Sequence, residues 1–145
     1  MKHKFAIIGL GIMGRRMLEN VMQHPKFELS GVWDPSDDAV AKTRLILPNA
    51  PVAQSAHDAM LGADVVYLAC PPGPRKTYAL EAAANGQGVF MEKPLGTDNA
   101  QSRDLLKQLE KARLPSVVNF TQAASRGFEE LTRAIQAGEV GELLG

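Results

Sequence analysis

Three glycines near the amino terminus constrain this fold more than any other feature of the sequence. Gly9, Gly11 and Gly14 follow the apolar run 5–8, and Asp34 comes twenty positions after the last of them. A strand, a G-x-G-x-x-G turn and a helix, followed at this distance by an acid, are typical of a dinucleotide site. The first glycine permits a tight turn, the second permits close approach of the backbone to a pyrophosphate, and the third permits close packing of the helix on the strand.

The acid and the first helix indicate which nucleotide such a site prefers. Ile12 and Met13 begin a helix whose free N–H groups point towards phosphate oxygens. Asp34 ends a predicted strand over 27–33, where its carboxylate can accept hydrogen bonds from both hydroxyls of a ribose. Residues 35–38 add two acids and no base, which disfavours a 2′-phosphate. We therefore expect NAD as the cofactor and expect NADP to bind less well.

Composition limits the remaining classes of function. The 145 residues suit one compact domain, and 16 basic against 16 acidic residues provide no general attraction for nucleic acid. No apolar run approaches the length of a membrane span, and Cys70 is the only cysteine. The basic start, 1–4, imitates a signal peptide, but glycines interrupt the apolar run after it and no small-residue cleavage site follows. We expect a cytoplasmic protein that acts on a small-molecule substrate.

The distribution of apolar residues and chain breakers predicts alternating strands and helices. Residues 65–69 are apolar in succession, as expected for a parallel strand covered on both faces. Gly86 and Gly138 end two of the helices, and Thr97 is placed to cap the start of another. Six strands with intervening helices predict a doubly wound parallel α/β fold. The predicted strands are 5–8, 27–33, 51–54, 64–69, 88–91 and 116–120, and the predicted helices are 12–23, 36–46, 55–61, the segment from the 71–74 break to 85, 97–112 and 126–137.

A second candidate site lies at Glu92-Lys93-Pro94, where the predicted strand 88–91 runs into a turn. Ligands of open parallel sheets bind beyond the carboxyl ends of the strands, which is where Lys93 emerges. A lysine there can donate to a substrate hydroxyl or carbonyl and can help a proton leave as a hydride departs. The motif alone leaves open the simpler interpretation that Glu92 and Lys93 are solvated turn residues.

Residues at two further strand ends carry weaker signals. Cys70 ends the strand 64–69 and, with Pro71 and Pro72, is placed to line the cofactor cleft. We expect its thiol to be buried and unreactive, since no histidine lies nearby in sequence. Asn119 follows the last strand and is placed to approach the nicotinamide or a substrate.

The remaining conspicuous side chains have packing or solvated roles as their simplest interpretation. Trp33 and Tyr78 are expected to pack, and Arg15 and Arg16 are expected to lie in solvent although either can reach a phosphate. The histidines have no second ligand at metal spacing, so we expect no metal site. They are His3, His24 and His57.

Taken in order, these segments resemble the Gfo/Idh/MocA oxidoreductases, a family that includes glucose–fructose oxidoreductase and inositol dehydrogenases. The resemblance spans essentially the whole chain, and the Glu-Lys-Pro turn distinguishes this family from other nucleotide-binding folds. The matching segments are 8–14, Asp34, 70–72, 81–86, 92–95 and 135–141.

The resemblance implies a Rossmann fold over 1–120, followed over 121–145 by a helix and the start of a connection to a second α+β substrate domain that this chain lacks. It implies that Lys93 is the catalytic lysine and that the bond before Pro94 is cis, and we expect the full-length protein to be a homo-oligomer. Many members have a histidine where this chain has Arg75, so that contact is not carried over. The residues expected to contact the cofactor are Gly9, Gly11, Ile12, Met13, Gly14, Asp34, Cys70, Pro71, Pro72, Glu92, Lys93, Pro94 and Asn119.

Three functions fit these observations. The first is an NAD-dependent dehydrogenase or reductase of a sugar, cyclitol or related hydroxy or keto compound, in which the protein orients the cofactor and substrate. The second is a non-catalytic, NAD-sensing regulatory protein of the same fold, against which the presence of Lys93 argues. The third is a methyltransferase, because sites for S-adenosylmethionine also combine a glycine loop with an acid after the second strand, but this leaves Glu92-Lys93-Pro94 unexplained.

Overall fold

A parallel β-sheet forms the centre of the molecule. The computed structural model describes residues 1–142 of the chain. Its five-stranded sheet has the order β2-β1-β3-β4-β5, and every neighbouring pair is parallel. This order confirms the predicted doubly wound topology, with the direction of winding changing between β1 and β3. The strands are β1 (His3–Ile8), β2 (Phe27–Trp33), β3 (Val65–Leu68), β4 (Gly88–Glu92) and β5 (Ser116–Asn119).

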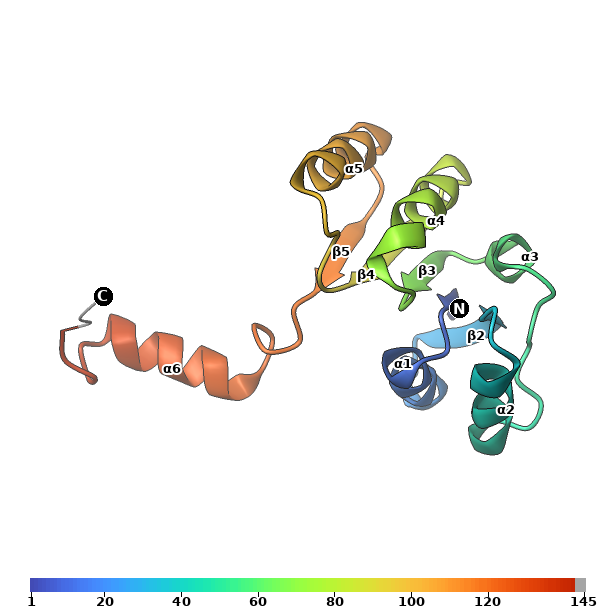
Figure 1. Ribbon diagram of the computed structural model, residues 1–145. Coiled ribbons are helices and arrows are strands. Elements are labelled where there is room, and N and C mark those ends of the chain that lie inside the picture. Colours follow the sequence, from blue (N-terminus) through green and yellow to red (C-terminus); the bar gives the residue numbers. More distant parts are fainter. Residues whose placement is uncertain (143–145) are drawn as a thin grey trace.

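Helices cover the sheet from both sides, and one helix leaves it (Figure 1). The helices α1 and α2 pack over β1 and β2, whereas α3, α4 and α5 lie on the opposite face. The last helix, α6, projects away from the sheet and buries none of its residues within the described chain (Figure 1). The helices are α1 (Ile12–Gln23), α2 (Asp37–Ile46), α3 (Ala56–Met60), α4 (Pro72–Ala84), α5 (Asn99–Ala112) and α6 (Arg126–Gln136).

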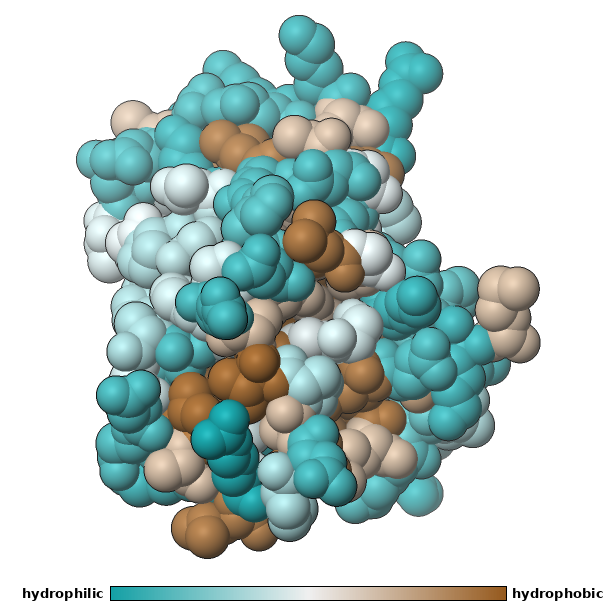
Figure 2. All heavy atoms as spheres, turned by 90° about the vertical axis from the view of Figure 1, so that its right-hand side faces the viewer, coloured by the Kyte–Doolittle hydropathy of each residue, from teal (hydrophilic) through white to brown (hydrophobic). Residues whose placement is uncertain are grey.

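Alternation along the strands divides the core into two layers. In β1, Phe5 and Ile7 belong to the layer under α1 and α2, whereas Ala6 and Ile8 belong to the layer under α3 and α4. Because both faces of this central strand are covered, four consecutive side chains are buried, which explains its unbroken apolar run. The solvent-facing side of the molecule that carries α2 and α3 is mostly hydrophilic, with apolar residues emerging between polar ones (Figure 2).

The sequence prediction of a strand over 51–54 is wrong. Only Val52 pairs with the sheet, through a single parallel bridge to Val32. Two hydrogen bonds make this bridge, from Val32 N to the Pro51 carbonyl at 2.9 Å and from Ala53 N to the Val32 carbonyl at 2.9 Å. Pro51 has no N–H to donate and lies at the sheet edge, so the ladder does not extend. The sheet therefore has five strands where the pattern predicted six.

Two helix starts also differ from the prediction. Asp98, rather than Thr97, caps α5 by accepting a hydrogen bond from Gln101 N at 2.8 Å. The segment 71–74, interpreted as a break, instead contains the first turn of α4, which begins at Pro72. Proline is well suited to the first helical position, because its missing N–H has no partner there in any case.

No helix among residues 1–142 is long and apolar enough to cross a membrane.

One face of β4 and β5 carries no helix within the described part of the chain, and an apolar groove of about 260 Å³ lies beside it. The groove is lined by residues at the starts of strands, among them Phe27, Val65 and Gly88. It therefore lies at the opposite end of the sheet from Asp34 and Lys93.

Two of the three loop glycines are required by contacts between backbone segments. Gly9 has a φ of +98°, and an added Cβ would lie 2.5 Å from the backbone nitrogen of Cys70. A Cβ on Gly14 would overlap the carbonyl oxygen of Gly9. These contacts confirm the predicted roles of Gly9 in a tight turn and of Gly14 in close packing, and they bring the glycine loop against the end of β3.

We expect Gly14→Ala to lower the free energy of unfolding by about 2 to 3 kcal/mol, because the new methyl group can be accommodated only by moving the backbone at Gly9. Gly73→Ala is the matched control, since Gly73 is also helical but has open space around its Cβ position. It should change stability by no more than about 1 kcal/mol. Urea unfolding followed by circular dichroism measures both, and equal stability of the two variants would contradict the packing argument.

Candidate functional site

A cavity of about 560 Å³ opens at the carboxyl ends of the strands. It lies where β1 and β3 wind in opposite directions, which is the usual ligand position in a doubly wound sheet. The glycine loop, the end of β2, the start of α4 and the end of β4 form its walls. Its lining residues are Gly9, Gly11, Met13, Trp33, Asp34, Pro35, Ala69, Cys70, Pro71, Pro72, Pro74, Arg75, Tyr78, Glu92 and Lys93.

Asp34 joins the end of β2 to the glycine loop. Its Oδ2 accepts a hydrogen bond from Leu10 N at 2.6 Å, and its Oδ1 accepts one from Ser36 N at 2.8 Å. An ionised carboxylate has about four lone-pair positions, so two remain for a ligand. Asp34 therefore orients the loop and still presents acceptors to the cavity.

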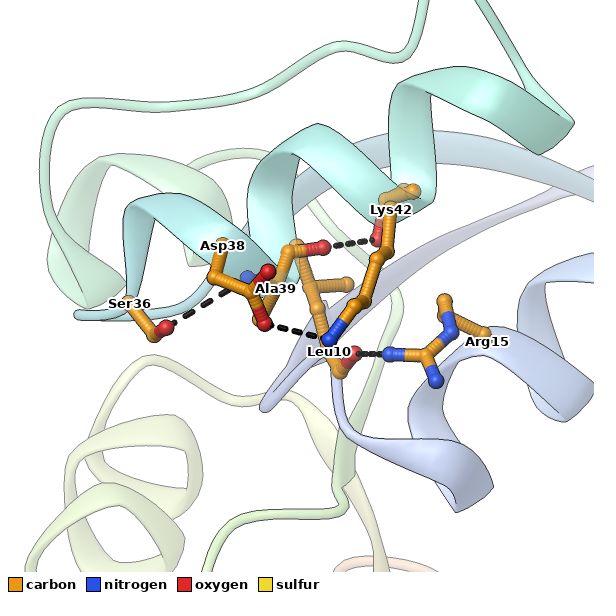
Figure 3. A network of polar contacts seen from close by, with 7 residues as sticks. Leu10, Arg15, Ser36, Asp38, Ala39 and Lys42 are labelled. Atoms are coloured by element: carbon orange, nitrogen blue, oxygen red, sulfur yellow. Dashed lines mark hydrogen bonds and ion pairs between the residues drawn. The ribbon is translucent and has the colours of Figure 1, made fainter.

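Polar contacts around the start of α2 and α1 hold this corner together (Figure 3). Arg15 Nη1 donates to the Leu10 carbonyl at 2.6 Å, so Arg15 is partly occupied in supporting the glycine loop. The Ser36 hydroxyl caps α2 by accepting from Ala39 N at 3.3 Å. Lys42 Nζ donates to Asp38 at 2.6 Å, an exposed i,i+4 pair that partly offsets the charge of Asp38.

The start of α1 forms part of the cavity wall. Gly11 is the N-cap residue of α1, and an added Cβ there would meet no atom within 4 Å. Met13 lines the cavity, whereas Ile12 is 68% exposed and is not among the lining residues of this cavity. The free N–H groups at this helix end form an anion-binding arrangement.

The opposite wall is aromatic, which the sequence analysis missed. Trp33 and Tyr78 meet edge to face with ring centroids 6.2 Å apart and an interplanar angle of 72°. Both were expected only to pack, yet both also line the cavity beside Asp34. The available signal was position, because Trp33 directly precedes the acid and Tyr78 lies in α4, the helix that begins at the last residue of the Cys-Pro-Pro segment.

Cys70 is buried in this wall. Burial raises the pKa of its thiol, and the nearby Arg75 guanidinium only partly opposes that rise. The thiol is therefore neutral at physiological pH, in agreement with the predicted packing role. Pro71 and Pro72 follow it along the cavity rim.

Lys93 stands between two cavities. It lines the cavity described above and also a second one of about 680 Å³, which extends towards Phe120 and the start of α6. Met13 is the other residue common to both. The Lys93–Pro94 peptide bond is cis, as the family resemblance implies. The exposed ammonium group is thus placed where a molecule in one cavity can meet a molecule in the other.

Beneath Lys93, the carboxylate of Glu92 is buried and hydrogen-bonded. Its Oε1 accepts from the Tyr67 hydroxyl at 2.5 Å and from Asn119 Nδ2 at 2.6 Å, and its Oε2 accepts from Lys93 N at 3.2 Å. Burial raises the pKa of the Tyr67 phenol, and the hydrogen bond to the Glu92 carboxylate raises it further. Tyr67 therefore remains a donor at neutral pH. Asn119 gives its amide to Glu92 and lines neither cavity, so direct contact of Asn119 with a cofactor remains a prediction.

Arg75 is buried behind the same turn and is only 2% exposed. Its Nη1 donates to the Glu92 carbonyl at 2.5 Å and to the Pro94 carbonyl, and its Nη2 donates to the Cys70 carbonyl at 2.5 Å. The sequence indicated only that this position departs from the family's usual histidine. Its contacts join α4 to the ends of β3 and β4.

Residues 3–120 match the sequence profile of the Gfo/Idh/MocA family, which is described as an oxidoreductase family with an NAD-binding Rossmann fold. The chain belongs to this family. Membership accounts for the glycine loop and the Glu-Lys-Pro turn together, so the methyltransferase interpretation is wrong.

Among residues 1–142, no three His, Cys, Asp or Glu side chains gather in a way that could hold a metal ion.

Known Gfo/Idh/MocA proteins and related structures align along nearly the whole chain. It is 24% identical over 143 residues to 2,7-anhydro-N-acetylneuraminate hydratase of Escherichia coli K12, covering 97% of this chain and 37% of the relative. It is 30% identical over 146 residues to inositol 2-dehydrogenase of Burkholderia vietnamiensis G4, covering 95% and 42%. The crystal structure of myo-inositol 2-dehydrogenase from Lactobacillus plantarum superposes with a TM-score of 0.88 at 19% identity, covering 99% and 44%. The chain thus spans about two fifths of the length of these proteins.

The hydrogen bonds to Glu92 give a stability prediction for this Gfo/Idh/MocA domain. We expect Tyr67→Phe to lower the free energy of unfolding by about 1 to 3 kcal/mol, because a buried carboxylate loses a donor. Tyr78→Phe is the control, since the described residues offer no hydrogen bond to the Tyr78 hydroxyl, and it should change stability by less than about 0.5 kcal/mol. Thermal and urea unfolding measure both variants, and equal losses would show that the Tyr67 hydroxyl is not a specific support of Glu92.

Proposed function

We propose that this chain is the cofactor-binding half of an NAD-dependent oxidoreductase, which transfers a hydride between nicotinamide and a sugar, cyclitol or related hydroxy or keto compound. One observation carries the proposal: a single cavity extends from Asp34, past Gly9 and Gly11, to Lys93. A dinucleotide needs a ribose acceptor, a pyrophosphate cradle and an open end for chemistry, in that order. The cavity offers the three in that order.

The Asp34 end suits the adenosine half of NAD. The two remaining acceptor positions of Asp34 fit the hydroxyls of a ribose, and the N–H groups at the start of α1 fit the pyrophosphate. The absence of a side chain at Gly11 leaves space for phosphate oxygens to reach the backbone. Trp33 and Tyr78 provide an apolar wall beside Asp34, against which an adenine ring can lie.

The Lys93 end suits the reacting half. Bound NAD supplies the hydride acceptor, and the protein has to hold the substrate oxygen and manage its proton. When an alcohol carbon gives up a hydride, the hydroxyl proton must also leave. Lys93 Nζ can accept that proton as an amine, or return it as an ammonium when a carbonyl is reduced. Its position between the two cavities places it beside both reactants.

Several further features of the whole protein belong to the same proposal. The inositol dehydrogenases among the relatives suggest a cyclitol or sugar as the substrate, and the hydratase shows that relatives differ in reaction. We infer a Rossmann domain over 1–120, followed by a segment over 121–145 that leads to a second domain, with residues 143–145 outside the described part of the chain. We also propose a cytoplasmic homo-oligomer. An NAD-sensing protein is the second candidate function. In the full-length protein it predicts cofactor binding with no turnover, whereas the oxidoreductase predicts turnover there that depends on Lys93.

Asp34 should make NAD bind more tightly than NADP by about tenfold to a hundredfold, because its charge opposes a 2′-phosphate. Asp34→Asn should reduce this preference several-fold while keeping a similar shape. Glu19→Gln is the control, since Glu19 is an exposed acid of α1 that does not line the cavity. Isothermal titration of both nucleotides tests the prediction, and equal or tighter binding of NADP by the unmodified chain would overturn it.

Residues 1–145 alone should bind NAD but should not oxidise a substrate. Asp34 and the glycine loop are present, whereas catalysis also requires groups that cover the nicotinamide, hold the substrate and exclude water. We propose that these groups lie in the second domain. An assay of the chain with NAD and a panel of polyols and sugars checks this, and saturable NADH production that Lys93→Ala abolishes would show that the domain is a complete enzyme.

A further inference from the structure

We propose that Arg75 is a positioning residue for Lys93. Arg75 holds the backbone on both sides of Lys93, so that the Lys93 ammonium group meets the nicotinamide end of the cofactor. The inference rests on the proposed function, because it assigns Lys93 to that end of the site. It is carried by the three carbonyl groups that Arg75 contacts and by the burial of its guanidinium.

The contacts of Arg75 flank Lys93 along the chain. The guanidinium donates to the carbonyl of Glu92, the residue before Lys93, and to the carbonyl of Pro94, the residue after it. The Lys93 side chain itself is exposed and lines both cavities. Because the Lys93 side chain is flexible and lies in solvent, the position of its Nζ depends on the backbone at Lys93. Arg75 holds that backbone.

The third contact connects Lys93 to the other wall of the cavity. Arg75 Nη2 donates to the Cys70 carbonyl, which lies just after β3 on the wall that continues to Pro71 and Pro72. One rigid, planar guanidinium therefore connects the segment that follows β3 to the turn that follows β4. β3 and β4 are already paired up to Leu68 and Met91, so Arg75 extends this connection beyond the last paired residues, where the chain borders the cavity beside Lys93.

The environment of Arg75 indicates that these carbonyl contacts are what stabilise its charge. A guanidinium that is 2% exposed needs compensation for lost hydration. Within residues 1–142, no carboxylate forms an ion pair with Arg75, and its Nε has no hydrogen-bond partner. The three backbone carbonyls are thus its main compensation, which makes them difficult to displace.

Glu92 supports the same turn from below. Its carboxylate accepts from Lys93 N and is itself held by Tyr67 and Asn119. The carbonyl of Glu92, the N–H of Lys93 and the carbonyl of Pro94 are therefore all bound by buried side chains. Such a fixed base reduces the number of positions available to Lys93 Nζ, which favours productive geometry.

The test separates the two halves of the cofactor. ADP-ribose lacks the nicotinamide, so positioning of Lys93 should not affect its binding, whereas NADH should depend on it. Arg75→Met removes all donors from a side chain of similar length, Arg75→Lys keeps the charge and part of the donor set, and Arg103→Met removes an exposed arginine from α5 as the control. Trp33, the only tryptophan, lines the cavity, so its emission follows ADP-ribose binding, and nicotinamide fluorescence follows NADH.

We expect Arg75→Met to weaken NADH binding about tenfold, a loss equivalent to about one net hydrogen bond, and to change ADP-ribose binding less than twofold. Arg75→Lys should restore part of the NADH affinity, and Arg103→Met should match the unmodified chain. Lys93→Met should also weaken NADH selectively. In the double variant, the substitution at Arg75 should add little to the effect of Lys93→Met, because Arg75 acts through Lys93.

Three results would overturn the inference. They are an equal loss of ADP-ribose and NADH binding in Arg75→Lys, no change for either ligand, and full additivity with Lys93→Met. If Arg75→Met does not fold, Arg75→Lys and its double variant decide the question alone. Failure of the unmodified chain to bind either ligand would contradict the proposed function itself, which distinguishes the two outcomes.

Discussion

The parallel alignment of the strands is the constraint on which the candidate site depends. All five strands end at the same edge of the sheet, and their pairing places Ile8 beside Trp33 and Leu68, and Glu92 beside Asn119. The residues that follow each strand therefore converge, although they are far apart in sequence. Winding in opposite directions from β1 and β3 separates the helices at this edge and leaves the cavity between them.

Close backbone contacts fix the glycine loop beside that cavity. Gly9 turns the chain against Cys70, and Gly14 lets α1 approach the Gly9 carbonyl. Asp34 then accepts from Leu10 N and closes the loop against the end of β2. The first helix therefore points its free N–H groups into the cavity instead of past it, which a loop with larger residues could not achieve.

Buried charges have a comparable role on the other side of the cavity. Arg75 and Glu92 are both almost inaccessible, yet they do not pair with each other through their side chains within the described residues. Each instead binds backbone groups around Lys93. Burial makes breaking these bonds costly, since an unpaired buried polar group loses its hydration without replacement. The exposed lysine thus stands on a turn that its neighbours hold firmly.

The sequence by itself determined the parallel fold, the glycine loop, Asp34 and the Glu-Lys-Pro turn, because each depends on local spacing or on the periodicity of apolar residues. It did not determine that 51–54 pairs through Val52 alone, since an edge strand needs partners that local pattern does not record. Only the tertiary structure decided the roles of Arg75, Tyr67 and Asn119, which reach Glu92 across 17, 25 and 27 residues of sequence. Trp33 and Tyr78 likewise line the cavity because the end of β2 lies beside α4, an arrangement that only the tertiary structure shows. The physical reason is that hydrogen bonds and packing between distant segments are fixed by strand register and helix placement, which no short motif encodes.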